Sequence, residues 1–272
     1  MRLQLKRILD TLARQSLTNM LAREKYAAEL RSSSRYADKR CLTRCEHRVF
    51  SQNGEDGAIR EIMKRIGGGR YFVEIGAGDG SENNTTFLLS LGWSGIWIEG
   101  NAANAVAIRK KFAKELSSGQ LTLQESFVSA ENINSLLAPC GAHQIDILSL
   151  DLDRNTYHVW KAMDMRPRLS VIEYNPSIPP GVDWAVDYVP DRWWDGSSYY
   201  GASLTAMARV GAEKGDLLVG CDLTGTNAYF VRADLCEDRF LSPGDVSVHY
   251  EPCRNYLQGR PTGHPRNYSD LS

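Results

Sequence analysis

Short hydrophobic runs alternate with helical patterns along most of the chain from Tyr71 onward. Runs of this length, bounded by glycine or polar residues, are typical of buried strands. The seven candidate strands are Tyr71–Ile75, Gly95–Glu99, Leu121–Gln124, Ile145–Asp151, Leu169–Tyr174, Asp216–Cys221 and Asn227–Arg232. Helical patterns lie between them at Asn84–Leu91, Ala102–Leu116, Glu131–Leu137, Asn155–Met163 and Ser203–Lys214. Strands separated by single helices predict βαβ units, and therefore a mostly parallel sheet with helices on both faces.

The connection between the last two strands predicts one reversal in this sheet. Only residues 222–226 separate them, which is too short for a crossover, so the two strands must pair as an antiparallel hairpin. The expected fold is α/β and Rossmann-like, with a mostly parallel seven-stranded sheet, one antiparallel strand near its edge and helices on both faces. Such a sheet resembles that of class I methyltransferases, a likeness of fold that by itself says nothing about chemistry.

The first 30 residues follow a different pattern. Six apolar residues recur at roughly helical spacing with basic residues between them: Leu3, Ile8, Leu12, Leu17, Leu21 and Leu30. Up to Arg48 the chain has 12 basic and 5 acidic residues, so this stretch carries +7 and the rest of a chain with net charge −1 carries −8. Two interpretations stay open: a solvated helix packed on its own acidic domain, or an arm that contacts a membrane surface or nucleic acid.

Composition is that of an ordinary globular protein, with 42% hydrophobic and 24% charged residues. We expect no signal peptide, because charged residues interrupt the start of the chain before an apolar segment can form. We also expect no transmembrane segment, since no stretch approaches the roughly 20 apolar residues that a span needs. The six cysteines have no framework spacing, which favours reduced thiols and a cytoplasmic location. Cys41, Cys45 and His47 are spaced closely enough for zinc, but a fourth ligand is not apparent.

The segment from Tyr71 to Gly80 suggests a ligand-binding loop. A hydrophobic strand runs into glycines spaced G-x-G-x-G, whereas the dinucleotide fingerprint G-x-G-x-x-G would place its third glycine at Ser81. The loop also carries Glu74 and Asp79, and carboxylates repel a pyrophosphate but suit the sulfonium and ammonium groups of S-adenosylmethionine. Glu99 ends the second strand, where an acid is well placed to accept hydrogen bonds from both ribose hydroxyls. The alternative is a tight turn and a helix cap.

Five segments of the chain resemble the FkbM-type methyltransferases. They are residues 51–57 (SQNGEDG), 72–80, 92–100, 146–160 with 171–175, and 220–231. The resemblance implies a Rossmann-like domain, an S-adenosylmethionine donor and O-methylation, commonly of sugars or glycan-like acceptors. It further implies that certain residues bind the cofactor. Glu74, Gly76, Gly78 and Asp79 would line the methionine half, Glu99 would hold the ribose, Ser126 and Phe127 would lie near the adenine, and Gln52 and Asp56 would close the pocket.

This resemblance divides the chain into three parts. We expect a basic N-terminal helical extension at 1–48, a methyltransferase domain at 49–240 and a C-terminal tail at 241–272. Within the domain, residues 176–200 form an aromatic insert or lid at the carboxyl edge of the sheet, a usual place for substrate contacts. Its candidate substrate residues are Trp184, Tyr188, Trp193 and Trp194, whose flat faces suit the C–H faces of sugars. The alternatives for the insert are a minor core of its own and a dimer contact.

Acidic residues follow two strands that are expected to lie side by side. Asp151, Asp153, Glu173 and Asn175 would converge at the carboxyl edge, where oxygen ligands in that number suit Mg²⁺ or Ca²⁺. Some sugar O-methyltransferases of similar fold use such a metal to lower the pKa of the acceptor hydroxyl. This chain departs from their pattern, because the position of their acidic pair on the fifth strand holds Glu173 followed by Tyr174 here. The alternative is that Asp151 and Asp153 cap the following helix.

Asp151 and His158 are the candidate catalytic residues. Asp151 is the expected essential residue, and His158 is a candidate general base because an unperturbed imidazole titrates near 6.5. Two other functions stay open: a metal-dependent nucleotide-sugar glycosyltransferase that uses Asp151 and Asp153, and a non-catalytic protein that keeps the cofactor fold. The expected partner is a small-molecule or glycan acceptor and not nucleic acid, with weak membrane-surface contact through the basic helix as an alternative. The sequence does not indicate the oligomeric state.

Overall fold

The computed structural model describes residues 18–142, 145–192 and 194–257. Its centre is a seven-stranded sheet in the order β3-β2-β1-β4-β5-β7-β6. The strands are β1 (Tyr71–Ile75), β2 (Ser94–Glu99), β3 (Leu121–Glu125), β4 (Ile147–Leu150), β5 (Leu169–Glu173), β6 (Asp216–Cys221) and β7 (Asn227–Arg232). All neighbouring strands are parallel except where β7 pairs with β5 and with β6. This arrangement confirms the predicted fold, including the single reversed strand.

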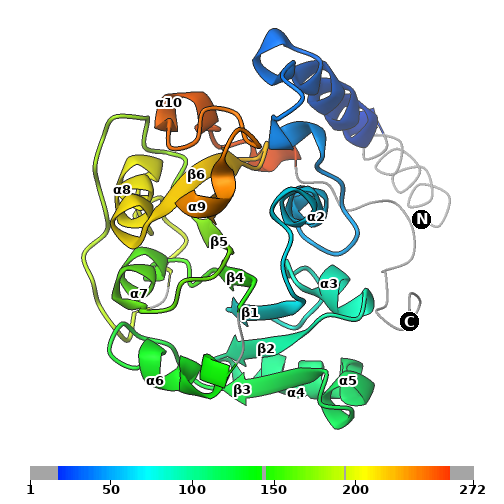
Figure 1. Cartoon of the computed structure of the whole chain (residues 1–272), viewed down its shortest axis with the longest axis vertical. Helices are drawn as coiled ribbons and strands as arrows, with labels where there is room; N and C mark the ends of the chain where they lie inside the picture. The colour runs from blue at the N-terminus through cyan, green and yellow to red at the C-terminus, as the bar shows by residue number, and fades with distance from the viewer. Residues whose placement is uncertain (1–17, 143–144, 193, 258–272) are drawn as a thin grey trace, which may run out of the picture.

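Helices cover both faces of the sheet (Figure 1). They are α2 (Glu55–Ile66), α3 (Thr86–Ser90), α4 (Ala102–Lys111), α5 (Ala113–Ser117), α6 (Ile133–Leu137), α7 (Thr156–Ala162), α8 (Leu204–Lys214), α9 (Ala233–Cys236) and α10 (Val246–His249). Short 3₁₀ turns occur at Ser34–Tyr36, Leu42–Arg44, Ala138–Ala142 and Asn255–Leu257. The sheet separates α2 and α3 from α7 and α8, which gives the three-layer arrangement expected of βαβ units.

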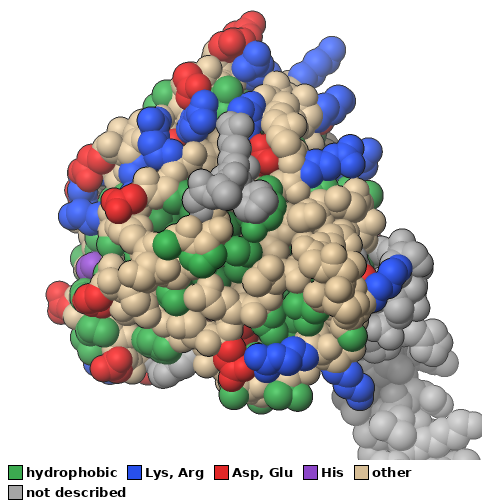
Figure 2. Space-filling model, turned by 60° about the horizontal axis from the view of Figure 1, so that its bottom comes forward, with side chains coloured by type: hydrophobic (Ala, Val, Ile, Leu, Met, Phe, Trp, Pro, Cys, Tyr) green, Lys and Arg blue, Asp and Glu red, His purple; other side chains and the backbone are tan. Residues whose placement is uncertain are grey.

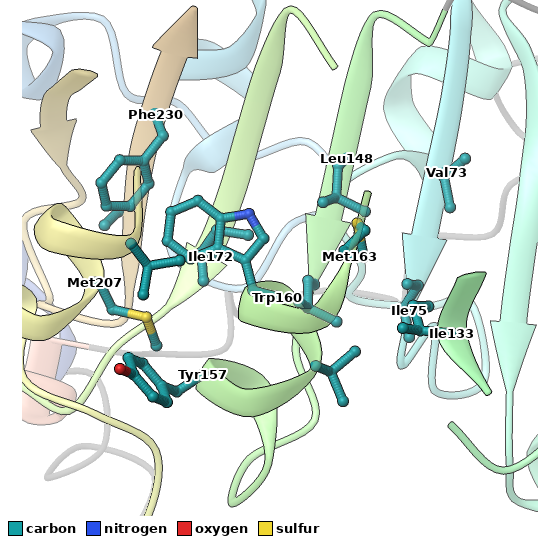
Figure 3. Packing of buried hydrophobic residues seen from close by; sticks show 14 of the residues in the cluster. Val73, Ile75, Ile133, Leu148, Tyr157, Trp160, Met163, Ile172, Met207 and Phe230 are labelled. Carbon is teal, nitrogen blue, oxygen red and sulfur yellow. The ribbon is translucent and has the colours of Figure 1, made fainter. Parts of the chain in front are cut away.

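Alternation along the strands divides the core in two. Val73 and Ile75 of β1 point to the layer of α6, α7 and α8, where the Trp160 and Phe230 rings lie 4.8 Å apart (Figure 3). Phe72 points to the opposite layer, which contains α2 to α4. Successive side chains of a strand face opposite ways, so neighbouring residues of β1 serve different layers. This alternation also decides where Glu74 points.

The structure corrects the helix predictions in three places. The predicted helix 102–116 is broken at Phe112, which is buried and packs edge-on against Trp97 with ring centroids 4.7 Å apart. The predicted helix 84–91 shortens to α3, because the Glu74 side chain of β1 accepts from the backbone amides of Asn84 and Thr85. The sequence analysis missed α2 altogether, although Ala58, Ile59 and Ile62 are buried at helical spacing.

Segments outside the predicted methyltransferase domain meet at the β6 edge. Tyr36 is buried, and its hydroxyl donates to Glu251 Oε2 at 2.8 Å. Leu42 packs against β6 near Gly220, and α10 contacts the same strand. The two flanking segments therefore cover a sheet edge that would otherwise offer unpaired backbone groups. The boundaries at residues 48 and 240 stay a prediction.

The N-terminal helix, which the structure describes over residues 18–31, packs differently from the predicted pattern. Leu21 is 55% exposed, and the side facing the body instead carries Met20, Arg23, Ala27 and Arg31. The earlier leucines of the predicted apolar stripe lie outside the described residues. Within the described ranges, no helix combines the length and apolar character that crossing a bilayer requires.

Exposed large hydrophobic side chains are concentrated in one part of the chain. Four of the nine among the described residues belong to the predicted insert: Val182, Val189, Trp194 and Tyr199. Figure 2 shows one face of the molecule, with hydrophobic side chains nearer its middle and charged ones mostly around its rim. Apolar side chains that stay in solvent are candidates for contact with a ligand or partner.

The turn after β1 has no space for a side chain at Gly76, so we predict that adding a single methyl group there destabilises the fold. A Cβ at Gly76 would lie 1.9 Å from the carbonyl oxygen of Asp151, and its φ of +82° disfavours any side chain. Gly76→Ala should therefore lower the free energy of unfolding by about 3 kcal/mol in urea denaturation. Gly119→Ala is the matched control, since it has φ +76° but no atom within 4 Å, and should cost about 1 kcal/mol. Equal losses in the two variants would contradict the predicted steric cause.

Candidate functional site

The polar side chains of the candidate site lie at the carboxyl edge of the sheet. The glycine loop follows β1, Glu99 ends β2, Asp151 follows β4 and Glu173 ends β5. Because these strands are parallel neighbours, their carboxyl ends meet at one edge, where ligands bind in open α/β sheets. Gly76 brings two of these strand ends into contact, since only a residue without a side chain fits beside the Asp151 carbonyl.

The amides of the three glycines in the loop each donate within the protein. Gly76 N donates to Ile98 O at 3.0 Å and Gly80 N to Ala77 O at 3.2 Å. Gly78 N donates to Glu99 Oε2 at 2.7 Å. A pyrophosphate in a dinucleotide fold needs such amides together with the start of a helix. Here α3 begins only at Thr86, so the loop is poorly suited to a phosphate.

Glu99 places a carboxylate directly beside the loop. Its side chain is 6% exposed. Oε1 accepts from Asn101 N at 2.7 Å, which fixes the carboxylate at the end of β2. A carboxylate oxygen accepts more than one hydrogen bond, so Glu99 keeps acceptor capacity for ligand hydroxyls. Its role as a ribose-binding acid stays a prediction.

Glu74 points away from the glycine loop, into the layer of α2 and α3. Its oxygens accept from Asn84 N at 2.8 Å, Thr85 N at 3.1 Å and Asn83 Nδ2 at 2.8 Å. Two neighbours in the sheet register, Trp97 and Ser149, also bond to residues 84 and 85. Burial raises the pKa of Glu74 to about 7. The contacts show Glu74 as an anchor for the segment before α3.

Asp79 also has a partner within the protein. Lys111 Nζ lies 2.7 Å from Asp79 Oδ2. Partial burial works to raise the pKa of Asp79, but hydrogen bonds from Lys111 and Ser81 outweigh it and hold the pKa below its ordinary value. Glu74 and Asp79 were the two acids from which the sequence predicted a cation-binding loop. In the structure, the carboxylate that contacts the loop backbone is that of Glu99.

Asp151, Asp153 and Glu173 form the candidate metal cluster. Each offers one oxygen, and these oxygens lie within 4.8 Å of one another, as the sequence predicted. Solvent reaches the Asp151 side chain, yet desolvation by the surrounding protein still raises its pKa. Burial and the charge of Asp151 raise the pKa of Asp153 to about 6. Burial followed by the charges of Asp151 and Asp153 raises the pKa of Glu173 well above its ordinary value.

Three carboxylates so close together repel one another, and either protons or a cation must offset that repulsion. Asp153 also has φ +50°, a backbone conformation that residues with side chains seldom adopt. Strained residues cluster at functional sites, although strain alone assigns no function. Cys41, Cys45 and His47 form no comparable group in the described part of the chain.

Asn175 holds the aromatic insert. It is fully buried, and its Nδ2 donates to Ser198 O at 2.8 Å and to Tyr200 O at 2.9 Å. Its Oδ1 accepts from Ser177 N at 3.0 Å. The sequence proposed Asn175 as a fourth metal ligand, but these contacts assign its amide to the insert.

Arg154 and Asn155 hold the other side of the insert. Arg154, 3% exposed, donates to the carbonyls of Asp187 and Tyr199, at 3.2 and 3.4 Å. Asn155 Nδ2 donates to Val189 O at 2.9 Å. Both residues directly follow the acidic cluster on the chain. Buried polar side chains therefore fix the insert beside the carboxylates, which makes it a wall of the site.

His158 contacts the insert and not the acidic cluster. Its Nε2 lies 2.7 Å from Val186 O, so this nitrogen carries the proton. The ring packs beside Tyr157 and Tyr188, with centroids 5.1 and 5.0 Å away. Tyr188, a proposed substrate residue, donates to Glu131 Oε2 at 2.7 Å. Both side chains tie the insert to neighbouring helices.

The remaining aromatic residues of the insert pair with one another. Trp184 packs against Tyr199 with centroids 5.5 Å apart, and Trp194 against Tyr200 at 6.0 Å. Trp193 lies outside the described residues. Burial, followed by nearby negative charges of which that of Glu173 is the largest, raises the pKa of Tyr200. The sequence analysis did not single out Tyr200, since aromatic content alone gives no position.

The four remaining predicted cofactor residues take different positions. Asp56 is buried, and its Oδ2 accepts from the amides of residues 49–51 at 2.7 to 2.9 Å. Gln52 is exposed, on the turn that Asp56 organises. Ser126 N donates to Glu99 O at 3.1 Å, and Phe127 lies beside Gly100. Ser126 and Phe127 therefore flank the end of β2, and their place near an adenine stays a prediction.

Glu55 and Asn227 are site residues that the sequence analysis missed. Glu55, the first residue of α2, is buried and accepts from Asn227 Nδ2 at 2.7 Å. Asn227 is the register partner of Glu173 across β5 and β7. Glu55 belongs to the motif SQNGEDG, so the sequence did mark this segment as functional. The direction of the Glu55 side chain could not be inferred, because helix α2 had not been predicted.

No family model and no curated protein sequence matches this chain. Solved structures of similar architecture include a provisionally assigned O-methyltransferase from Klebsiella pneumoniae (16% identity, 69% of this chain and 83% of that one, TM-score 0.43). The glycopeptide N-methyltransferase MtfA with sinefungin is 14% identical over 70% of this chain and 90% of its own, with TM-score 0.40. The methyltransferase domain of bacterial CtHen1 is 12% identical over 65% and 96%, with TM-score 0.43. These similarities describe architecture alone.

The buried carboxyl of Glu74 predicts that stability falls as pH rises. A folded-state pKa of about 7, above the ordinary value, means that the protonated form is favoured in the folded state. The contribution is complete below the ordinary pKa and is lost as pH rises through about 7. Between pH 5 and 8 the free energy of unfolding should fall, with Glu74 accounting for about 3 kcal/mol. Glu74→Gln should show a shallower slope in urea melts, and identical slopes would contradict the assignment.

Proposed function

We propose that this chain is an S-adenosylmethionine-dependent O-methyltransferase of the FkbM type that acts on a hydroxyl of a sugar or glycan-like acceptor. The contact between Gly78 N and Glu99 Oε2 carries the proposal. It occupies an amide that a dinucleotide would need and fixes a negative charge where a pyrophosphate would lie. The same carboxylate suits the hydroxyls of a ribose and a donor with positive charge.

The chain has residues that fit each part of this cosubstrate. Glu99 would bind the ribose, Ser126 and Phe127 would flank the adenine, and the backbone of Gly76 and Gly78 would lie along the methionine half. S-adenosylmethionine supplies an electrophilic methyl group on a sulfonium that leaves as neutral S-adenosylhomocysteine. Because that leaving group is already activated, the protein has to align the acceptor and remove one proton.

Asp151 is our candidate for the residue that receives this proton. It is in contact with solvent, it lies beside the glycine loop, and its raised pKa improves a carboxylate as a base. As the acceptor oxygen bonds to the methyl carbon, its hydroxyl proton would pass to an Asp151 oxygen. His158 is less suited, because its ring contacts Val186 O and Tyr188 of the insert and not the acidic cluster.

As an alternative to Asp151 acting as the base, we propose that Asp151, Asp153 and Glu173 hold a divalent cation, which would then activate the acceptor hydroxyl in place of the free carboxylate. Oxygens within 4.8 Å of one another fit a single ion, since opposite ligands of Mg²⁺ or Ca²⁺ lie about 4 to 5 Å apart. A bound cation would lower the pKa of an acceptor hydroxyl. On the acceptor side, Trp184, Trp194 and Tyr199 offer aromatic faces that suit the C–H faces of a sugar.

Calorimetry tests the donor site. The protein should bind S-adenosylmethionine, and Glu99→Gln should weaken that binding about tenfold or more, because a charge-assisted hydrogen bond is lost. Glu125→Gln is the matched control, since Glu125 is the register partner of Glu99 on β3 but pairs with Arg109, and it should bind normally. Binding of NADH or of a UDP-sugar in place of S-adenosylmethionine would refute the proposal, and the second result would favour a glycosyltransferase.

Methyl transfer tests the role of Asp151. With labelled S-adenosylmethionine and extracted glycans, Asp151→Asn should lower the rate at least about 100-fold, because the proton acceptor is lost. Donor affinity measured by calorimetry should change less than about threefold.

The assay should be run with Mg²⁺ and with EDTA, and loss of activity in EDTA would support the cation. Full activity of Asp151→Asn would contradict its role, and wild-type protein that binds the donor but transfers no methyl to any acceptor would favour a non-catalytic protein.

A further inference from the structure

A cavity of about 390 Å³ lies beneath the N-terminal helix, where the helix faces the β6–β7 turn. The helix forms one wall with Met20, Arg23, Ala27 and Arg31, which recur at helical spacing. The opposite wall consists of residues 46–48, the turn at 52–54 and the β6–β7 turn at 223–224. Its volume is within the range of small-molecule sites.

The cavity borders the acidic cluster through a short chain of hydrogen bonds. Asn53 lines the cavity, and its backbone amide donates to Glu55 Oε2 at 2.8 Å. Glu55 accepts from Asn227, which pairs with Glu173 in the sheet. The charge of Glu55 is also felt by Asp151. The Glu55 carboxylate therefore lies between the cavity and the proposed reaction centre.

The donor site lies on the other side of that centre. Glu99 ends β2, whereas the cavity is lined by the turn that joins β6 to β7. In the sheet order, β7 is the fourth strand from β2. At about 4.8 Å per strand this separation is about 19 Å. On its nearer side the cavity approaches the segment after the glycine loop, because Arg48 pairs with Glu82 at 3.5 Å. An acceptor in the cavity would thus extend toward the carboxylates from the side opposite the ribose.

Basic groups outnumber acidic ones in the cavity wall. Arg23, Arg31 and Arg48 line it together with His47, against Glu24 and Glu46. Burial and the charge of Asp222 raise the pKa of Glu46 well above its ordinary value, although the charge of Arg31 opposes that shift. The balance of charge in the wall is positive.

Arg31 lines the cavity and already has one partner there. Its Nη2 donates to Glu46 Oε2 at 2.9 Å. Its Nε is buried and has no hydrogen-bond partner among the residues that the structure describes. A guanidinium presents its donors in a planar fork that matches the oxygens of a phosphate or a carboxylate. The Arg31 side chain is 36% exposed, so an oxyanion in the cavity would contact its exposed part and not the buried Nε.

We infer that this cavity binds an oxyanion group, phosphate or carboxylate, on the sugar-like acceptor, whose hydroxyl then extends toward Asp151. The inference rests on the proposed methyltransferase function and assigns the acceptor class of the same site. The arginines hold the charged end, and the aromatic insert contacts the remainder. The acceptor is therefore an acidic sugar derivative and not a neutral one.

Binding of three model compounds to the full chain, saturated with S-adenosylhomocysteine, tests this assignment by calorimetry. Glucose 6-phosphate and glucuronate represent the two sources of an oxyanion, and glucose is the neutral reference. At least one of the charged compounds should bind about tenfold more tightly than glucose, and the preference between them identifies the oxyanion. Glucose binding as tightly as both would overturn the inference.

Variants on the same helix locate the site. Arg23→Gln should weaken binding of the preferred charged compound at least about fivefold and leave glucose unchanged. Lys25→Gln is the matched control, because Lys25 pairs with Glu29 and does not line the cavity, and it should have no effect. Equal effects of the two variants would contradict a local site. Arg31→Gln is a second probe, read together with urea melts because it also removes the partner of Glu46.

Measurement of donor binding distinguishes a failure of the acceptor assignment from a failure of the proposed methyltransferase function. S-adenosylhomocysteine affinity is measured first on each protein and should not change in Arg23→Gln, since Arg23 lies far from Glu99. If the donor product binds but no charged compound is preferred, the acceptor assignment fails and the methyltransferase proposal stands. If the donor product does not bind at all, the proposed function fails.

Discussion

The backbone contact between Gly76 and Asp151 determines the geometry of the candidate site. Two parallel neighbours, β1 and β4, end at the same level, and the first residue after β1 lies against the first residue after β4 with no space for a side chain. The glycine loop and the acidic cluster are consequently parts of one rigid edge. Under the proposed function, a donor at the loop and an acceptor at Asp151 would therefore lie close together.

This edge combines charges that a folded protein normally keeps apart. Asp151, Asp153, Glu173 and Glu55 lie within interaction range, and the pKa values of the first three are raised. Hydrogen bonds from Asn53, Thr156 and Asn227 stabilise part of this charge. The remaining buried negative charge destabilises the folded state. A sheet edge with only a structural role would not need that charge. Such a cost is typical of sites where ligands bind or protons move.

Much of the fold could be predicted from the sequence because strand periodicity and connection length are local signals. All seven strands form close to their predicted bounds, and the reversal of β7 follows from the short link at 222–226. Helix α2 was missed, although its buried positions follow helical spacing. The break at Phe112 could not be predicted, since it depends on Trp97, which is distant in sequence.

The site was less predictable, because side-chain direction depends on register and not on motif. Glu74 belongs to the glycine motif, yet alternation along β1 turns it into the opposite layer, where it anchors residues 83–85. Asn175 follows an acidic strand end but bonds to the insert. The grouping of Asp151, Asp153 and Glu173 was predictable, since parallel neighbours place their ends together.

The N-terminal helix contributes little to the core, as the exposure of Leu21 and Tyr26 indicates, and yet it supplies one wall of a cavity. Residues on such a wall are able to change with small effects on folding, whereas those at the sheet edge are not. Related chains with this architecture are therefore free to diversify in what they recognise by exchanging a few side chains on one peripheral helix, while the machinery at the strand ends stays the same.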